Sequence, residues 1–153
     1  MKLALKYGLI IAAGAMLWVL IAHQLFPNPM SPVHSLGAFS FFNLLHFVML
    51  FLGIRAFERE KGDKPTFKEG LKTGVSISFV YAATISLFFV VVLLVIGPKW
   101  MANDPTVFQI SPWVLVLRSF SGLVVFTMIL GLVYSTLISF ALAKRQSSET
   151  SLS

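Results

Sequence analysis

Asn43 and His46 are the residues whose types and spacing could do chemistry inside the long apolar stretches of this chain. They are three residues apart, so on a helix they share one face with Phe39, Leu50 and Gly53. An ionisable side chain in such a place is by default a hypothesis of function, because a neutral imidazole can relay a proton. The same pair can instead bridge helices, since each such hydrogen bond is worth about 0.6 to 2 kcal/mol. We favour the bridging interpretation.

Arg118, His23 and His34 are polar residues near the ends of the apolar stretches. Arg118 lies near the start of the fourth stretch, which is longer than a bilayer core requires, so we expect its side chain to snorkel to the headgroups. An inward-facing Arg118 that binds an anion or pairs with Asp104 is the alternative. The two histidines have no third carboxylate or thiolate ligand nearby in the sequence, so we expect no metal site.

No spacing of His, Ser, Asp, Glu or Gly matches a catalytic motif strongly enough to name a reaction. No acidic residue lies in any of the apolar stretches, so a histidine base lacks an orienting carboxylate, and an ion-coupled transporter lacks its usual coupling group. The absence of cysteine excludes disulfides, thiolate metal sites and cysteine nucleophiles. We therefore predict a protein that is not an enzyme and that holds no cofactor and no metal.

Four apolar stretches must position these residues, and each is long enough to cross a bilayer. A spanning helix needs about 20 mostly apolar residues, because hydrocarbon offers the backbone no water. The 153-residue chain is 57% hydrophobic and only 12% charged, and its mean hydropathy is +0.86. We predict an all-α polytopic membrane protein: a four-transmembrane-helix bundle over residues 1–146, then a disordered cytoplasmic tail over 147–153. The spans are expected at about 7–26, 36–54, 75–97 and 113–143.

The basic residues predict the orientation of this bundle. Of the 12 Lys and Arg residues, the first connection has none and the third has only Lys99, whereas the second connection and the two termini hold nearly all the others. The positive-inside rule therefore predicts that both termini are cytoplasmic. We expect six of these residues to contact lipid headgroups: Arg55, Arg59, Lys68, Lys72, Lys144 and Arg145. The net charge of +6 needs no nucleic acid as partner, because no aromatic-basic recognition stripe is present.

The segment after Pro65 predicts the start of a helix. Thr66 and Glu69 have the spacing of a capping box, in which each side chain accepts a hydrogen bond from the other residue's backbone amide. Phe67 and Leu71 share one face beside two lysines, so we expect a short interfacial helix before the third span. A membrane-surface anchor is a better interpretation of this helix than a docking site for a partner.

Small residues recur on two of the spans. They are Gly8, Ala12 and Ala15 on the first span and Gly131, Ser135 and Ser139 on the fourth. Lipid tails are as apolar as leucine, so close van der Waals contact must drive helix association, and small residues indicate the seams. We favour seams between helices of one chain over a homodimer seam, because the four spans of one chain must already pack together. The polar residues of the third span are scattered, which favours helix-helix bonding over a pore lining.

Three segments carry a resemblance to a known family: Leu5–Ile10, Leu52–Arg55 and, above all, Thr66–Gly74. They resemble a domain-of-unknown-function family of small four-span bacterial membrane proteins. The resemblance covers almost the full length and implies a bacterial cytoplasmic (inner) membrane setting with the same topology. The family has no assigned activity, so the resemblance carries over no catalytic residue.

Together these patterns predict an integral membrane protein of unknown activity. We favour a non-enzymatic structural, assembly or regulatory component that contacts membrane lipids and either a protein partner or a second copy of itself. The alternative is a small oligomeric transporter or channel that uses Asn43 and His46 at the bilayer midplane. A membrane enzyme with a histidine base is the weakest of the three hypotheses.

Overall fold

A computed structural model describes residues 2–25, 32–62, 65–96 and 111–150. Its elements are four α-helices: α1 (Lys2–Leu25), α2 (Pro32–Lys61), α3 (Phe67–Ile96) and α4 (Pro112–Thr150). Each helix is long and apolar enough to cross a membrane, over Lys2–Ala22, Leu36–Lys61, Phe67–Val95 and Trp113–Ala143. The protein is a multi-pass membrane protein, and the predicted number of spans is confirmed.

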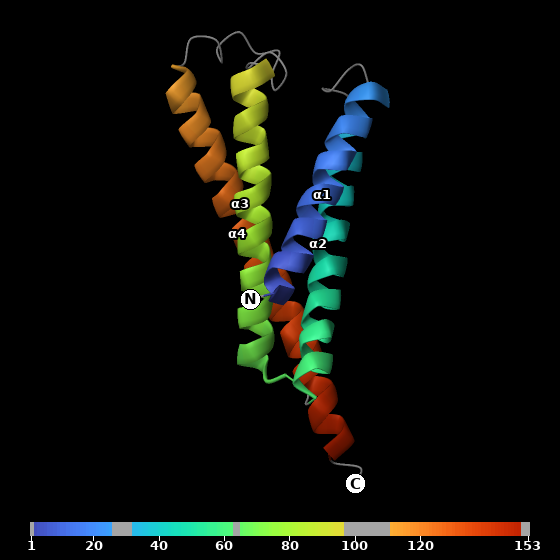
Figure 1. Cartoon of the computed structure of the whole chain (residues 1–153). Helices are drawn as coiled ribbons and strands as arrows, with labels where there is room; N and C mark the ends of the chain where they lie inside the picture. The colour runs from blue at the N-terminus through green and yellow to red at the C-terminus, as the bar shows by residue number, and fades with distance from the viewer. Residues whose placement is uncertain (1, 26–31, 63–64, 97–110, 151–153) are drawn as a thin grey trace.

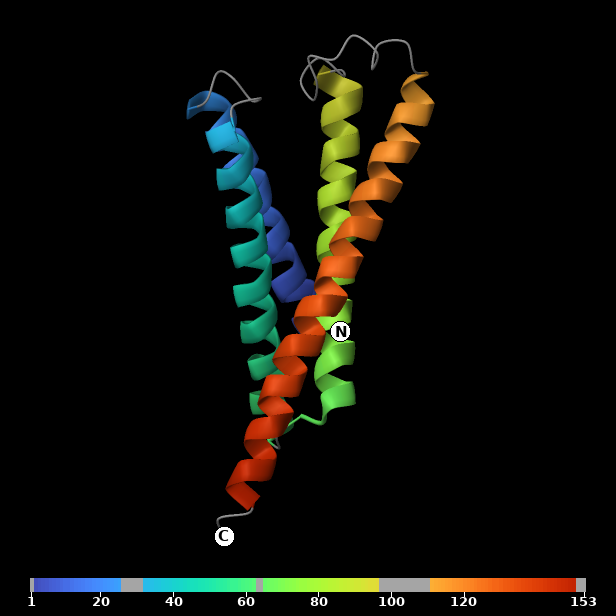
Figure 2. The same cartoon turned by 180° about the vertical axis from the view of Figure 1, so that it is seen from behind.

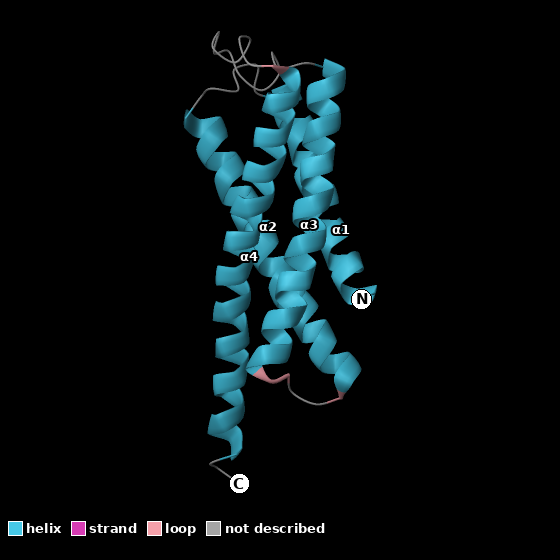
Figure 3. Ribbon diagram, turned by 90° about the vertical axis from the view of Figure 1, so that its left-hand side faces the viewer, coloured by secondary structure: helices cyan, strands magenta, loops and turns pink. Residues whose placement is uncertain are grey.

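Toward one end the helices form two pairs, with α1 beside α2 and α3 beside α4 (Figures 1 and 2), although over its whole length α1 packs more extensively against α3 than against α2. The pairs are close at the end of the molecule where α2 ends and α3 begins, which we call the closed end. They diverge at the other end, where α4 begins, which we call the open end. The helix α3 contacts each of the other three and packs most extensively against α4. The longest helix, α4, has 39 residues and extends past the others at the closed end (Figure 3).

The core lies in the middle of the bundle and toward the closed end. Ile11 of α1, Ile54 of α2 and Ile77 of α3 are each 0% exposed and belong to one apolar cluster. On the outer faces, large apolar side chains are exposed along the whole bundle, for example Leu20 at 57% and Leu117 at 69% toward the open end and Phe140 at 63% toward the closed end. In a bilayer these exposed side chains contact lipid, so they stabilise the helices in the membrane rather than the contacts between them.

Small residues form the seam between α3 and α4. A methyl group on Gly70 would lie 2.6 Å from the Ser139 hydroxyl oxygen, and one on Gly74 would lie 2.7 Å from the Ser135 Cβ. We call this seam, with its two antiparallel rows, the small-residue seam; its rows are Gly70, Gly74 and Ser78 on α3 and Ser139, Ser135 and Gly131 on α4. Each row advances by four residues, so the small side chains lie along one face of each helix. The internal seam predicted for the fourth span is confirmed.

The small residues of α1 also lie inside the bundle. A methyl group on Gly8 would be 2.7 Å from the Val80 side chain and 2.9 Å from the Ile77 carbonyl oxygen. Ala12 and Ala15 are each 1% exposed. Because α1 packs extensively on α3, this row is a second internal seam, as predicted.

Aromatic packing joins α1 to α2. The rings of Trp18 and Phe41 stack with centroids 4.4 Å apart and planes 16° apart. One turn earlier on α1, Gly14 faces Leu45, since a methyl group at that glycine would lie 2.8 Å from a Leu45 methyl carbon. These two contacts hold α1 beside α2 in the part of the bundle where the two helix pairs diverge.

The turn between α2 and α3 is closed by backbone and side-chain hydrogen bonds. Gly62 has φ of 80°, and its N–H donates to the Glu58 carbonyl at 3.1 Å, which is a helix end that favours glycine. The predicted capping box is confirmed: the Thr66 hydroxyl accepts from the Glu69 N–H at 3.3 Å, and the Glu69 carboxylate accepts from the Thr66 N–H at 2.9 Å. Lys61 lies 2.7 Å from that carboxylate and connects the two helices.

Two details of the predicted fold differ in the structure. The residues after Pro65 do not form a separate interfacial helix, because α3 is continuous from Phe67 to Ile96. The helix α4 continues to Thr150, so residues 147–150 are helical although we expected them in a tail. The physical reason is the same in both places: once a helix is nucleated, each further residue adds a hydrogen bond without a new nucleation cost. Residues 151–153 lie outside the described part.

Candidate functional site

Asn43 and His46 project from α2 toward the pair formed by α3 and α4. His46 is 2% exposed, and its Nε2 lies 3.0 Å from the hydroxyl oxygen of Ser78 on α3. The Tyr134 hydroxyl on α4 donates a hydrogen bond of 2.5 Å to the Asn43 side-chain oxygen. The predicted pair therefore connects α2 to both helices of the small-residue seam.

Aromatic rings surround the imidazole. The centroid of the His46 ring is 5.0 Å from that of Tyr81 and 5.6 Å from that of Tyr134, both in edge-on arrangements. Gly131 makes room for Ser78, which a methyl group there would overlap; the same methyl group would lie in ordinary contact with the imidazole, 3.5 Å from its Cε1 atom. We call these side chains the polar cluster; its members are Asn43, His46, Ser78, Tyr81 and Tyr134.

Both polar atoms of the Asn43 side chain are used inside the protein. Its oxygen accepts from Tyr134, and its nitrogen donates to the Phe39 carbonyl at 2.7 Å, one turn earlier on α2. This satisfies a side chain that would otherwise be costly in hydrocarbon. The bond to Phe39 stays within α2, so only the bond to Tyr134 can hold helices together.

His46 and Ser78 have the spacing of a base and a nucleophile, which is about 2.6 to 3.2 Å. Both are buried, with Ser78 at 0% exposed, and the nearest described acidic residues lie near the closed end. Among the described residues, no group of three His, Cys, Asp or Glu side chains could hold a metal. The cluster can thus bridge helices or carry a proton over a short distance, while hydrolysis would first require a path to Ser78.

Arg118 does not join this cluster. It is exposed, and it precedes Tyr134 by 16 residues, which is about 24 Å along a helix. Its position near the open end, five residues after Trp113, is compatible with the expected snorkelling. Asp104 and the side chains of His23 and His34, which could accompany it, lie outside the described part of the structure.

The basic residues predicted to contact lipid headgroups lie at the closed end. Arg59, Lys68 and Lys72 are exposed, and Arg55 lies with its guanidinium carbon 5.6 Å from the centre of the Phe51 ring. The side chains of the last two predicted contacts, Lys144 and Arg145, are not described. The described residues therefore place four cations at one end of the bundle.

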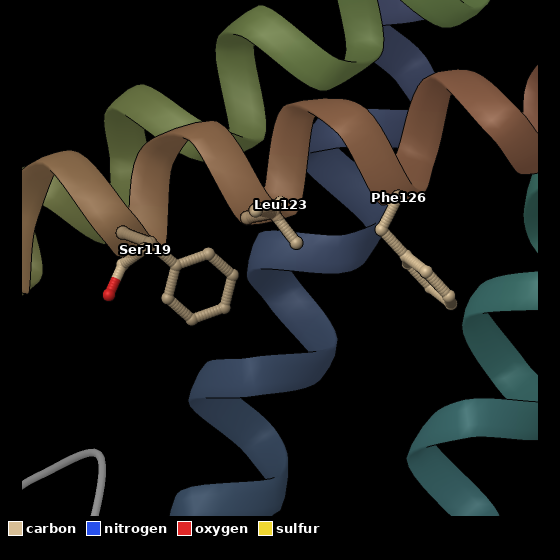
Figure 4. Close-up of a pocket in the computed structure, with 5 residues that line it drawn as sticks. Ser119, Leu123 and Phe126 are labelled. Atoms are coloured by element: carbon tan, nitrogen blue, oxygen red, sulfur yellow. The ribbon is translucent and has the colours of Figure 1, made fainter.

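A second feature, a pocket near the open end, was not predicted from the sequence. It has a volume of about 370 Å³, and we call it the lateral pocket; it is lined by Phe89 of α3 and by Ser119, Gly122, Leu123 and Phe126 of α4. In Figure 4 the labelled side chains project from α4 toward α1. The one signal that could have found it is Gly122, a small residue that does not continue the row of Gly131, Ser135 and Ser139.

The chain matches a known protein family. Residues 6–104 match the family described as "Protein of unknown function (DUF4199)", which confirms the family resemblance based on the three short segments, over these residues rather than over almost the full length. The match covers more than half of the chain and includes Asn43, His46 and Ser78, whereas Tyr134 and the lateral-pocket residues of α4 follow it. No curated protein and no solved structure matches the chain.

Proposed function

We propose a function for this chain, which belongs to the DUF4199 family of proteins of unknown function: it is a non-enzymatic structural, assembly or regulatory component of a membrane. The observation that carries this proposal is that the two polar residues predicted in the second span bond to side chains of neighbouring helices. His46 bonds to Ser78, and Asn43 bonds to Tyr134. Hydrogen bonds between helices specify how the helices of a membrane protein pack. The hydroxyl oxygens of Ser86, Ser135 and Ser139 are buried without a hydrogen-bond partner among the described residues, so the proposal rests on these two bonds and not on a fully paired interior.

The proposed setting is a bacterial inner membrane with both termini in the cytoplasm. The support is the charge at the closed end, where Arg59, Lys68 and Lys72 are exposed. A cytoplasmic surface with this charge attracts anionic headgroups, each cation contributing about 1 kcal/mol near the surface. In this orientation the first turns of α3 lie at headgroup depth, and the open end faces the outer side.

Reporter fusions test the orientation. A reporter fused after Lys61 or after Lys144 should show a cytoplasmic location, and one fused after Asp104 should show the outer side. A cytoplasmic signal at Asp104 would contradict the proposed topology and with it the assignment of the basic surface.

A small oligomeric transporter or channel is the second candidate function. The observation that favours it is the depth of His46, which is ten residues from Leu36 and fifteen from Lys61 in the same spanning segment. An ionisable group at that depth is where a proton relay would lie. Four helices rarely enclose a path, so a pore would require several copies of the chain.

Two substitutions of His46 separate these functions. His46→Gln retains an amide that can bond to Ser78 but cannot titrate, whereas His46→Leu removes the bond as well. A packing role predicts that His46→Gln keeps the level of protein in the membrane and its binding partner, and that His46→Leu reduces both. A stable His46→Gln protein that has lost proton or solute flux in vesicles would favour transport and contradict our proposal.

Purification from the native membrane in a mild detergent tests for the partner directly. An equally tagged, unrelated four-span protein serves as the control for non-specific capture. A stoichiometric partner that is present only with this chain supports an assembly or regulatory role. A preparation that contains only copies of this chain, and that transports solute after reconstitution, would refute it.

A further inference from the structure

We propose that the lateral pocket binds one acyl chain of an anionic glycerophospholipid, whose phosphate Arg118 holds. The site is separate from the proposed function, which rests on the polar cluster. It is made by side chains of α3 and α4 near the open end, and its lining is apolar except for the Ser119 hydroxyl. Figure 4 shows that the pocket side of α4 faces α1 across the divergence of the two helix pairs.

The size and the apolar lining of the pocket suit a hydrocarbon chain. Its volume of about 370 Å³ far exceeds the share of one water molecule in liquid, about 30 Å³. Water is a poor occupant, because a buried water needs two to four polar partners and the lining offers essentially one hydroxyl. An empty space would lose the dispersion contacts of Phe89, Leu123 and Phe126. In a bilayer, the neighbouring material that can restore those contacts is an acyl chain.

Gly122 keeps the pocket open. It is exposed, and a methyl group placed on it would meet no atom within 4 Å. The glycines of the small-residue seam differ, because the same addition there would overlap a facing serine. Gly122 therefore does not serve close helix packing, and its lack of a side chain leaves the space between Ser119 and Phe126 unfilled.

Arg118 supplies the charge for the headgroup. It lies one helical turn before Gly122, so the two positions share a face of α4. Side chains on a helix lean toward its N-terminus, which for α4 is the open end, so the guanidinium extends away from the pocket toward the headgroups. From the open end inward, Arg118 comes first and the pocket residues Gly122 and Phe126 follow. A lipid has the same order, with its phosphate at the membrane surface and its acyl chain below. Arginine binds phosphate through two parallel hydrogen bonds.

The helices offer Arg118 no carboxylate as a competing partner. The acidic residues in the four helices all lie toward the closed end or beyond it; they are Glu58, Glu60, Glu69 and Glu149. A second copy of this chain is a poor occupant as well. A two-fold symmetric contact through this face of α4 would bring the Arg118 side chains of both copies together. An anionic lipid neutralises the cation and fills the apolar space at the same time.

Native mass spectrometry of the full chain tests the proposal, with dioleoyl phosphatidylglycerol or dioleoyl phosphatidylcholine added to the detergent. Gly122→Leu and, independently, Ser119→Leu fill the pocket, and Arg118→Gln removes the charge. Gly37→Leu is the matched control, because Gly37 is also exposed and has no atom within 4 Å of an added methyl group. Lys2→Gln is the matched control for loss of a cation, because Lys2 is also exposed and is not among the predicted headgroup contacts.

The wild-type chain should retain one phosphatidylglycerol molecule, and either pocket-filling variant should reduce the retained fraction about tenfold. Arg118→Gln should abolish the preference for phosphatidylglycerol over phosphatidylcholine, and both controls should behave as wild type. Circular dichroism shows whether each variant is folded.

Equal retention of phosphatidylglycerol by the wild type and by folded Gly122→Leu and Ser119→Leu would overturn the proposal. A wild-type dimer that only Gly122→Leu dissociates, without a change in lipid, would overturn it in favour of a second copy. Equal losses of stability in Arg118→Gln and Asp104→Asn, with lipid unchanged, would assign Arg118 to an ion pair.

Discussion

Replacing Gly74 by alanine should separate α3 from α4, because this glycine faces Ser135 in close contact across the small-residue seam. The added methyl carbon would be 2.7 Å from the Cβ of Ser135 and 3.3 Å from a methyl carbon of Ile54. The hydroxyl of Ser135 can rotate away, but its Cβ is fixed to the backbone of α4. The helices must therefore move apart to accommodate a single methyl group.

The size of the effect follows from the distance. Carbon atoms pack best at about 3.5 to 4.0 Å, so the Cβ–Cβ contact at position 74 is short by about 1 Å. Overpacking of this kind costs about 1 to 3 kcal/mol. Alanine is also a better helix former than glycine, by up to about 1 kcal/mol. Gly37→Ala is the control for this gain, because a methyl group on Gly37 has no neighbouring atom within 4 Å. The free energies of unfolding of the two variants should therefore differ by about 1 to 3 kcal/mol, which is the cost of the added methyl group between α3 and α4.

Unfolding by dodecyl sulfate in mixed micelles, followed by far-UV circular dichroism, measures this difference. The double variant Gly74→Ser with Ser135→Gly exchanges the two side chains across the seam and should recover at least about 1 kcal/mol of the separate losses. Equal stability of Gly74→Ala and Gly37→Ala would refute the close approach of the helices. Strictly additive losses in the double variant would refute the pairing of positions 74 and 135.

Three further predictions concern the hydrogen bonds and the turn, and each is measured by the same unfolding experiment. Tyr134→Phe leaves the Asn43 oxygen without its donor and should cost about 0.5 to 2 kcal/mol; a double-mutant cycle with Asn43→Leu that shows no coupling would contradict the bond between them. Thr66→Ala removes one half of the capping box and should cost about 0.5 to 2 kcal/mol, whereas an unchanged midpoint would mean that the box does not stabilise α3. Lys61→Gln breaks an exposed ion pair with Glu69, so we expect at most about 1 kcal/mol, vanishing at high salt; a larger loss that is independent of salt would contradict this.

The polar cluster shows what one sequence can and cannot predict. The spacing of Asn43 and His46 predicts that they share a face, because that depends only on the period of a helix. Their partners, Ser78 and Tyr134, are 32 and 91 residues away in the chain. Which residues meet across two helices depends on the register of packing, and the apolar periodicity of a membrane helix carries no information on register. The bridging role favoured from the sequence is compatible with these bonds and stays a prediction until the variants are measured.

The small-residue seam was predicted for only one of its two helices. Gly131, Ser135 and Ser139 stand out on α4 because the residues around them are large and apolar. On α3, Gly70 and Gly74 fall in the segment that we assigned to a separate interfacial helix, and Ser78 was grouped with scattered polar residues. The error has one physical cause: a helix that starts at the capping box continues straight into the span. Extending the helix from Thr66 reveals the step of four residues.

The seam and the lateral pocket have a common origin in the size of the side chains along α3 and α4. The row on α3 continues past Ser78 to Ala82 and Ser86, which are both 0% exposed, so small residues persist toward the open end on this helix. On α4 the same step of four residues leads from Gly131 to Thr127 and then to Leu123, a much larger residue that lines the pocket. Transmembrane backbones approach closely only where both faces are small. The close packing of α3 against α4 therefore ends at Leu123, and the space beside Gly122 follows from that change in side-chain size.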